Sequence, residues 1–174
     1  MAAAGSGERL GAGGPKAFVS LAGRPMVEWS IATMRAAAGV GSIVIACPPG
    51  HVHDLECHDV DVVDGGATRA QSVANALAAV GTELVAIHDA ARPLVTPELV
   101  EGVVAVLVTD PEADGAIAAT PVTDTIKRTP QCQMKDLAPS DGHNVSFAIE
   151  ATVDRDRLWA AQTPQVFRVD SLRR

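Results

Sequence analysis

Short β-branched apolar segments alternate with longer helical patterns along most of the chain, and this alternation restricts the possible folds more than any other feature. The strand-like segments, each bounded by turn residues, are residues 42–47, 59–64, 83–88 and 115–120. The helical segments are residues 25–38, 70–80 and 97–108. Continuous apolar strands separated by helices indicate parallel strands that are covered on both faces and joined by right-handed crossovers. We therefore predict an α/β fold with a doubly wound, mostly parallel sheet.

The alternation stops after Val122, where two extended stretches surround a long polar segment. The extended stretches are residues 124–128 and 147–153, and the polar segment is residues 129–144. We interpret this region as a protruding β arm at about residues 122–153. A length of 174 residues fits one domain. We therefore predict a single domain over residues 1–174 that carries this arm.

Charge and cysteine content exclude several classes of protein. The formal net charge of -7 argues against non-specific nucleic-acid binding, because such a surface needs surplus lysine and arginine to neutralise phosphates. The cysteines Cys47, Cys57 and Cys132 form no CxxC pair, so neither a disulfide framework nor a zinc ribbon is expected. No apolar run approaches the ~20 residues of a membrane-spanning helix, and the start lacks a secretory pattern. We expect a cytoplasmic protein that does not associate with membranes.

The first motif that points to chemistry is the glycine-rich segment at residues 2–10, which is followed by Pro15 and Lys16. Glycines let backbone N–H groups approach an anion closely, while Arg9 and Lys16 add positive charge to the same loop. A dinucleotide-binding fingerprint would need glycine where Leu10 stands, and a Walker A loop would need Gly-Lys-Ser/Thr at residues 14–17. The segment therefore predicts a polyphosphate-binding loop, with a flexible glycine-rich terminus as the alternative.

Two further motifs follow predicted strands, which is where ligands gather in α/β sheets. Residues 64–73, DGGATRAQSV, are compatible with a base-recognition loop or with a tight turn in which Thr68 caps the next helix. Residues 88–93, HDAARP, place Asp89 at the end of a strand, where a carboxylate can hold the Mg²⁺ of a nucleoside triphosphate. The alternative for Asp89 is a cap or turn residue that forms a salt bridge with Arg92.

These motifs resemble those of 2-C-methyl-D-erythritol 4-phosphate cytidylyltransferases. The resemblance runs from Ala2 to about Leu172 and includes AAAGSGERL, PKAF, DGGATRAQSV, HDAARP, PVTDTIKR and TVDRDRLWAAQTPQVF in the family's order. It implies a Rossmann-like nucleotidyltransferase fold and the transfer of a cytidylyl group from CTP, with Mg²⁺, in the non-mevalonate route to isoprenoid precursors. The nearest alternative enzyme is a ribitol 5-phosphate cytidylyltransferase, but the DTIKR segment favours methylerythritol phosphate.

The resemblance also implies roles for individual residues. The residues expected to line the nucleotide are Ala3, Ala4, Gly5 and Gly7, those expected to bind the triphosphate are Arg9 and Lys16, and those expected to recognise cytosine are Gly66 and Ser72. Asp89 would hold the metal, with Ala90 beside the ribose. Thr125 and Arg155 on the arm would bind the methylerythritol phosphate of a neighbouring subunit, so a homodimer is expected.

The sequence departs from the family pattern at both ends and in two internal places. Family members begin with a buried strand ahead of the Ala-Ala-Gly loop and end with a longer C-terminal part, so we expect a truncated chain that could be a nucleotide-binding fragment without turnover. Ala67 replaces an acidic residue, and residues 130–146 are longer than the usual arm connection. The density of His51, His53, Cys57 and His58 matches no standard zinc spacing, and no metal site is predicted there.

Overall fold

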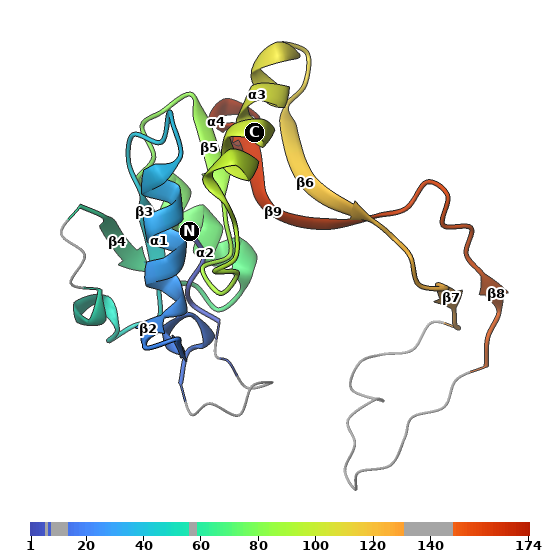
Figure 1. Cartoon of the computed structure of the whole chain (residues 1–174), viewed down its shortest axis with the longest axis horizontal. Helices are drawn as coiled ribbons and strands as arrows, with labels where there is room; N and C mark the ends of the chain where they lie inside the picture. The colour runs from blue at the N-terminus through green and yellow to red at the C-terminus, as the bar shows by residue number, and fades with distance from the viewer. Residues whose placement is uncertain (6, 8–13, 56–58, 131–147) are drawn as a thin grey trace, which may run out of the picture. The chain divides into compact units, whose positions relative to one another are not determined.

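The computed structural model describes residues 1–5, 7, 14–55, 59–130 and 148–174. It divides the chain into two compact units, of which the first comprises Met1–Ala118 and Gln162–Arg174 and the second comprises Ala119–Ala161 (Figure 1). The range predicted for the β arm, residues 122–153, falls within the second unit.

Besides a short hairpin, the first unit contains strands of two sheets. Strand β3 (Val44–Cys47) runs parallel to β4 (Asp61–Asp64), with Val44 opposite Asp61 and Cys47 opposite Asp64. The second sheet has the order β5–β9–β6. Its strands are β5 (Leu84–Ile87), β9 (Trp159–Arg168) and β6 (Gly115–Pro121).

The first three residues of the chain connect the two sheets. Ala2 forms parallel bridges to Ala46 at the end of β3 and to Asp89 just beyond β5. The nitrogen of Ala3 donates to the carbonyl of Ala46 at 2.8 Å, and the nitrogen of Ala2 donates to the carbonyl of His88 at 2.9 Å. Residues 2 and 3 therefore have the hydrogen bonding of a strand ahead of the glycine loop. Because the pairing is parallel on both sides, β4, β3, residues 1–3 and β5 all point toward the same edge.

The helices begin where the sequence supplies capping residues. Thr68 accepts a hydrogen bond from Gln71 N at 3.1 Å and starts α2 (Arg69–Ala78). Thr96 accepts from Leu99 N at 3.3 Å and starts α3 (Pro97–Thr109), whose first residue is a proline. Both caps satisfy N–H groups that the helix itself leaves unpaired, and proline at the first position has no N–H group to satisfy.

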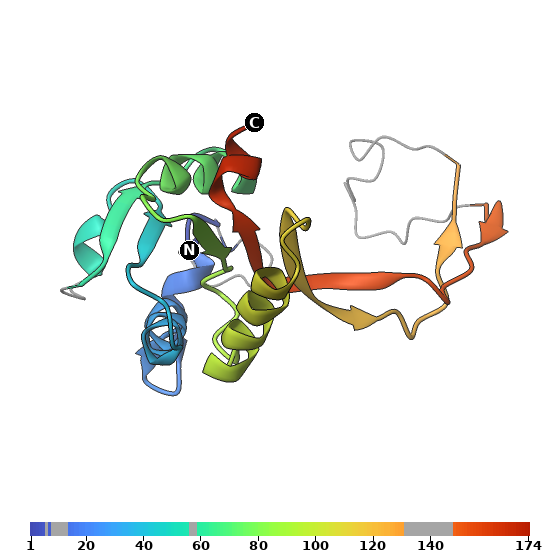
Figure 2. The ribbon, with the colours of Figure 1, turned by 90° about the horizontal axis from the view of Figure 1, so that it is seen from above.

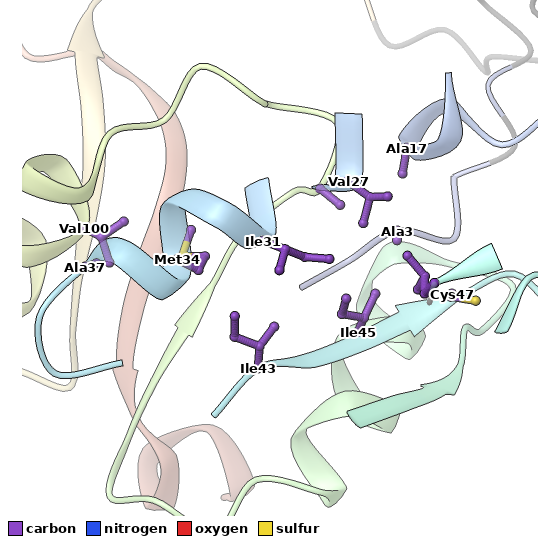
Figure 3. Packing of buried hydrophobic residues seen from close by; sticks show 12 residues of the cluster. Ala3, Ala17, Val27, Ile31, Met34, Ala37, Ile43, Ile45, Cys47 and Val100 are labelled. Carbon is purple, nitrogen blue, oxygen red and sulfur yellow. The ribbon is translucent and has the colours of Figure 1, made fainter. Parts of the chain in front are cut away.

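Helices cover both faces of β3. Ile43, Ile45 and Cys47 lie in one cluster of buried residues with Ile31 and Met34 of α1 (Met26–Ala36), and Figure 3 shows the side chains of Ile31 and Met34 turned toward those of Ile43 and Ile45. The alternate residues of β3, Val44 and Ala46, are buried with Ala76 of α2. Figure 2 shows α2 and α4 (Val169–Arg173) on the side of the strands opposite to α1 and α3. The predicted α/β fold is confirmed, and β3 is buried on both of its faces.

The longest strand, β9, was not predicted from the sequence. It pairs antiparallel with β5, with Ile87 opposite Gln165, and Val166 is buried against Val103 and Leu107 of α3. A proline within an apolar run argues against a central strand, because it cannot donate to the ladder. Because of Pro164, the sequence pattern did not indicate this strand, which lies between β5 and β6 in the structure.

Several short elements also escaped the sequence analysis. They are the hairpin β1 (Ser20–Leu21) and β2 (Arg24–Pro25) and the single turns η2 (Lys16–Phe18) and η3 (Val52–Asp54). The hairpin turns through Ala22 and Gly23, which have φ angles of 53° and 82°. Two successive positive φ angles are typical of the tight turn that fits the twist of a two-stranded hairpin.

The second unit contains an antiparallel pair of two-residue strands. Strand β7 (Lys127–Arg128) pairs with β8 (Ala151–Thr152), and the nitrogen of Val153 donates to the carbonyl of Ile126 at 2.9 Å. Most of the predicted polar segment lies in residues 131–147, outside the described residues.

Candidate functional site

Three loops follow parallel strand segments of the first unit and leave the sheet at the same edge. The glycine-rich loop follows residues 1–3, the Gly65–Gly66 turn follows β4, and Asp89 follows β5. In an open α/β sheet, the crevice outside the carboxyl ends of the strands is the usual place for a ligand. The three motifs identified in the sequence therefore share one edge.

The glycine-rich loop closes on itself at its base. The nitrogen of Lys16 donates to the carbonyl of Gly5 at 3.1 Å, which sets the start of η2 beside the start of the loop. Gly7 has a φ of +74°, and a Cβ there would lie 2.5 Å from the carbonyl oxygen of Gly14. Glycine is therefore required at position 7 for both conformation and close approach. The Lys16 side chain is exposed, and Arg9 lies outside the described residues.

Ala3 and Ala4, at the start of this loop, lie in different surroundings. Ala3 is only 2% exposed and belongs to the buried cluster beneath α1, whereas Ala4 is half-buried. The side chain of Ala3 is thus part of the core. A contact from Ala3 to a nucleotide would have to come from its backbone.

Gly65 holds the second loop against the first. A Cβ at position 65 would lie 2.3 Å from the Cβ of Ala4 and 3.0 Å from the carbonyl oxygen of Cys47. The nitrogen of Gly65 donates to that same carbonyl at 2.6 Å. The two loops are in van der Waals contact because residue 65 has no side chain.

Gly65→Ala is expected to push the two loops apart, since neither Ala4 Cβ nor the Cys47 carbonyl can move without shifting backbone. Forcing a methyl group into a filled space typically costs about 1–3 kcal/mol, so the urea midpoint of unfolding should fall by the corresponding amount. Gly81→Ala is the matched control, because a Cβ at that position meets nothing within 4 Å. Equal unfolding midpoints for the two variants would show that the loop contact is not tight.

Ser72 organises the second loop rather than facing outward. Its hydroxyl accepts from the nitrogen of Gly66 at 3.0 Å and donates to the carbonyl of Thr68 at 3.0 Å, and the residue is 2% exposed. The structure therefore places the predicted pair Gly66 and Ser72 in direct contact. Because the hydroxyl makes both hydrogen bonds within the loop, it holds the turn in one conformation. It therefore determines which backbone groups of the turn face outward.

Asp89 lies between two guanidinium groups. Arg69 Nε donates to one carboxylate oxygen at 2.8 Å and Arg92 Nε donates to the other at 3.3 Å. Arg92 also donates to the side chain of Gln162 on β9. From the sequence, Arg92 was expected only as a salt-bridge partner of Asp89, and Arg69 was not linked to Asp89. The structure adds Arg69 and Gln162 to the group around Asp89.

His88, directly after β5, is fully buried and stabilises the sheet beside Asp89. Its Nδ1 lies 3.0 Å from the hydroxyl of Thr163 on β9, and its carbonyl accepts the hydrogen bond from Ala2. Burial lowers the pKa of His88 to about 4, so its imidazole is neutral at physiological pH. Ala90 is also fully buried, and its backbone bonds to Ala2 and Ser30, which fixes the turn after Asp89.

A metal ion at this edge would depend on its ligand for most of its coordination. The described residues contain no group of three or more His, Cys, Asp or Glu side chains that could hold a metal. Mg²⁺, however, is commonly bound through one or two carboxylates together with substrate phosphates. Asp89 fits that pattern, because its carboxylate is 28% exposed at the strand end. For the separate histidine-rich segment, His51 pairs with Asp54 at 2.6 Å, while Cys57 and His58 lie outside the described residues.

Thr125 and Arg155 both belong to the second unit and lie near each other along its paired segments. The guanidinium of Arg155 donates to the carbonyl of Thr123, two residues before Thr125. Both residues are exposed. The other predicted site residues belong to the first unit.

No helix within the described ranges is both long and apolar enough to cross a membrane. This observation agrees with the absence of a long apolar run in the sequence.

Comparison with known proteins gives one consistent family. Residues 1–174 match the family model IspD, described as 2-C-methyl-D-erythritol 4-phosphate cytidylyltransferase. A relative of that name from Frankia casuarinae is 43% identical over 175 residues, which cover 98% of this chain and 60% of the relative. One from Cereibacter sphaeroides is 40% identical over 181 residues and covers 99% and 72%. The crystal structure of the enzyme of that name from Thermus thermophilus has 34% identity and a TM-score of 0.67, over 93% of this chain and 69% of that one.

Proposed function

The chain belongs to the family of 2-C-methyl-D-erythritol 4-phosphate cytidylyltransferases, and we propose that it transfers the cytidylyl group of CTP to 2-C-methyl-D-erythritol 4-phosphate. The products are 4-diphosphocytidyl-2-C-methyl-D-erythritol and pyrophosphate, in the non-mevalonate route to isoprenoid precursors. The family match over residues 1–174 carries this proposal. The position of three loops at the same edge of the sheet, where the strands end, supports this proposal.

The chemistry that this site has to supply is mainly positioning and charge neutralisation. A phosphate oxygen of the acceptor attacks the α-phosphorus of CTP, and the bond to the leaving pyrophosphate breaks. A phosphate monoester has its second pKa near ~6, so it is already ionised at neutral pH and needs no strong general base. Lys16, on the exposed surface of η2 beside Gly5, would stabilise the negative charge that grows on the phosphorus and on pyrophosphate. Arg9 has the same role by resemblance.

The nucleotide would lie over the two glycine turns. Backbone N–H groups of the loop at Gly5 and Gly7 would contact the phosphates, and the turn at Gly66, fixed by Ser72, would contact the base. The tight contact between Ala4 and Gly65 sets the spacing of these two regions. This arrangement would hold both ends of CTP with backbone groups that need little reorganisation on binding.

Asp89 would hold the Mg²⁺ that CTP brings. The ion would neutralise phosphate charge when bound, as it does in other phosphoryl-transfer enzymes. Arg69 and Arg92 hold the two oxygens of Asp89 from either side and therefore fix the orientation of its carboxylate. Triphosphate oxygens and water would complete the coordination.

The proposal also covers assembly and location. By resemblance, Thr125 and Arg155 of one subunit would bind the methylerythritol phosphate held by its partner, which requires a homodimer. A cytoplasmic location is consistent with the sequence, in which no run is apolar enough to cross a membrane.

The direct test is pyrophosphate release by the purified chain with CTP, Mg²⁺ and 2-C-methyl-D-erythritol 4-phosphate. Ribitol 5-phosphate replaces the acceptor in a parallel reaction, and ATP replaces CTP in another. We expect release only with CTP and methylerythritol phosphate. Faster release with ribitol 5-phosphate would instead identify the alternative polyol acceptor.

CTP binding by calorimetry separates an inactive chain from one that has lost the site. A folded chain that binds CTP but releases no pyrophosphate would be the nucleotide-binding fragment considered above. A folded chain that neither binds CTP nor releases pyrophosphate would overturn the proposed function.

A further inference from the structure

His88 is a buried polar side chain to which the proposed reaction assigns no role. The residue is fully buried, and its Nδ1 lies 3.0 Å from the hydroxyl oxygen of Thr163 on β9. Its Nε2 is also buried and has no hydrogen-bond partner among the residues that the structure describes. A buried polar atom without a partner costs free energy that an apolar side chain of similar shape would avoid. Packing alone therefore does not explain an imidazole at this position, and the contact through Nδ1 is the interaction that an apolar residue could not make.

The hydroxyl of Thr163 joins the ring of His88 to the backbone of Asp89. The nitrogen of Asp89 donates to this hydroxyl oxygen at 3.4 Å. Strands β5 and β9 pair antiparallel, and their register continued by two residues sets Thr163 opposite Asp89. Pro164, which faces His88 in that register, has no backbone N–H group with which to extend the ladder. The Thr163 side chain therefore supplies the link between β9 and Asp89 at the point where the ladder stops.

Asp89 is thus held from two sides. At the surface, Arg69 and Arg92 contact its carboxylate, and both of these side chains are about half exposed. On the inner side, the His88–Thr163 pair is almost completely buried. Close packing confines buried side chains to fewer conformations than exposed ones. The buried pair is therefore the more rigid support for the backbone from which the Asp89 carboxylate projects.

We propose that His88 is a positioning residue for Asp89. Its Nδ1 holds the hydroxyl of Thr163, and this hydroxyl holds the backbone of Asp89 so that the carboxylate faces the triphosphate. The inference rests on the proposed cytidylyl transfer, in which Asp89 holds the Mg²⁺ of CTP. His88 acts through Thr163 and Asp89, because its own side chain is fully buried. A hydroxyl can both donate and accept, so the contact forms whichever ring nitrogen carries the proton.

Two amide substitutions separate positioning from packing. Asparagine at position 88 places an amide atom near the location of Nδ1, whereas glutamine places its amide near the location of Nε2. Glutamine fills more of the buried space, so His88→Asn should lower the urea midpoint of unfolding more than His88→Gln does. We expect the opposite order for activity. The kcat/KM for pyrophosphate release should stay within about threefold of wild type in His88→Asn and fall about 10–100-fold in His88→Gln, as is typical when a group that orients a metal-binding side chain is lost.

Hydrogen exchange of the free chain tests the contact without CTP, acceptor or metal. The amide of Asp89 should exchange at least about tenfold faster than in wild type in both His88→Gln and Thr163→Val, since each variant releases the Asp89 nitrogen. In His88→Asn its exchange rate should stay within about threefold of wild type. The amides of Leu84–Ile87 are the internal control, because a general loosening of the sheet would accelerate their exchange as well.

A double variant tests whether His88 acts through Thr163. If it does, the variant with both His88→Gln and Thr163→Val should lose no more than about twofold in kcat/KM beyond the less active single variant. Independent contributions would multiply instead.

Three results would overturn the inference. They are equal activity of His88→Gln and His88→Asn, unchanged exchange of the Asp89 amide in His88→Gln, and losses that multiply in the double variant. A wild-type chain that releases no pyrophosphate would contradict the proposed function instead, and the exchange measurement would still decide whether His88 holds Asp89.

Discussion

Lys16→Ala is expected to lower kcat/KM for cytidylyl transfer by about 10²–10³-fold, the loss typical of removing one group that stabilises transition-state charge. The Lys16 side chain is exposed, so its removal should leave the free energy of unfolding within about 0.5 kcal/mol of the wild-type value. Pyrophosphate release under saturating and limiting CTP measures the effect. A loss mainly in kcat would show that Lys16 acts in the transition state rather than in binding CTP.

The matched control for Lys16→Ala is Arg35→Ala. It removes one positive charge from the exposed surface of α1, where Arg35 makes only a long 3.9 Å contact with Asp59. Exposed pairs of this kind contribute little, so activity and stability should both stay near wild type. If the two variants lost activity equally, net charge rather than the position of Lys16 would explain the result.

Asp89→Asn is expected to lower kcat/KM by at least about 100-fold and to raise the Mg²⁺ concentration needed for half-maximal rate. Asparagine keeps the shape of the side chain but loses the charge that would hold the ion. The contacts to Arg69 and Arg92 are partly exposed, so their weakening should cost no more than about 1 kcal/mol each. The measurements are Mg²⁺ titrations of pyrophosphate release and urea unfolding of both proteins.

Asp114→Asn is the control for this substitution. Asp114 also pairs with an arginine, Arg174, at 3.1 Å, but it is exposed and follows α3 rather than β5. Its activity and Mg²⁺ dependence should match those of wild type. If Asp89→Asn also retained activity and the same Mg²⁺ dependence, Asp89 would be only a structural partner of Arg69 and Arg92.

The sequence was sufficient for the parallel part of the fold because each element there has a strong local pattern. The run that contains Ile43, Ile45 and Cys47 on one face and Val44 and Ala46 on the other is apolar throughout, as a strand buried on both faces must be. Thr68 and Thr96 likewise cap the helices that their positions predict. The strand β9 has no such local pattern, because Pro164 interrupts it and its position depends on pairing with β5, far away in the sequence.

In the candidate site, too, local sequence patterns predicted some residues, whereas contacts between distant parts of the sequence could not be predicted. Gly7, Gly66 and Asp89 could be selected from the sequence because glycine loops and a strand-end carboxylate have recognisable patterns. The group of side chains around Asp89 could not be predicted. Arg69 lies 20 residues before Asp89 in the sequence, and Gln162 lies 73 residues after it. The role of Ser72 within its own loop was also missed, because a helical serine usually reads as a surface residue. Arg9 stays a prediction, as it lies outside the described residues.

The pairing of residues 1–3 with Ala46 and with His88 determines when the glycine loop can form as the chain leaves the ribosome. Ala2 has no partner on one side until residue 46 has emerged, and none on the other until residue 88 has emerged. Strand β5 in turn waits for β9, which ends at Arg168. Contacts this distant in sequence must offset the entropy lost in closing long loops before they stabilise the folded chain. Residues 1–3 therefore have all their native neighbours only after residues 46, 88 and 168 have been synthesised, and until then they depend on whatever shields their apolar surroundings in the cell.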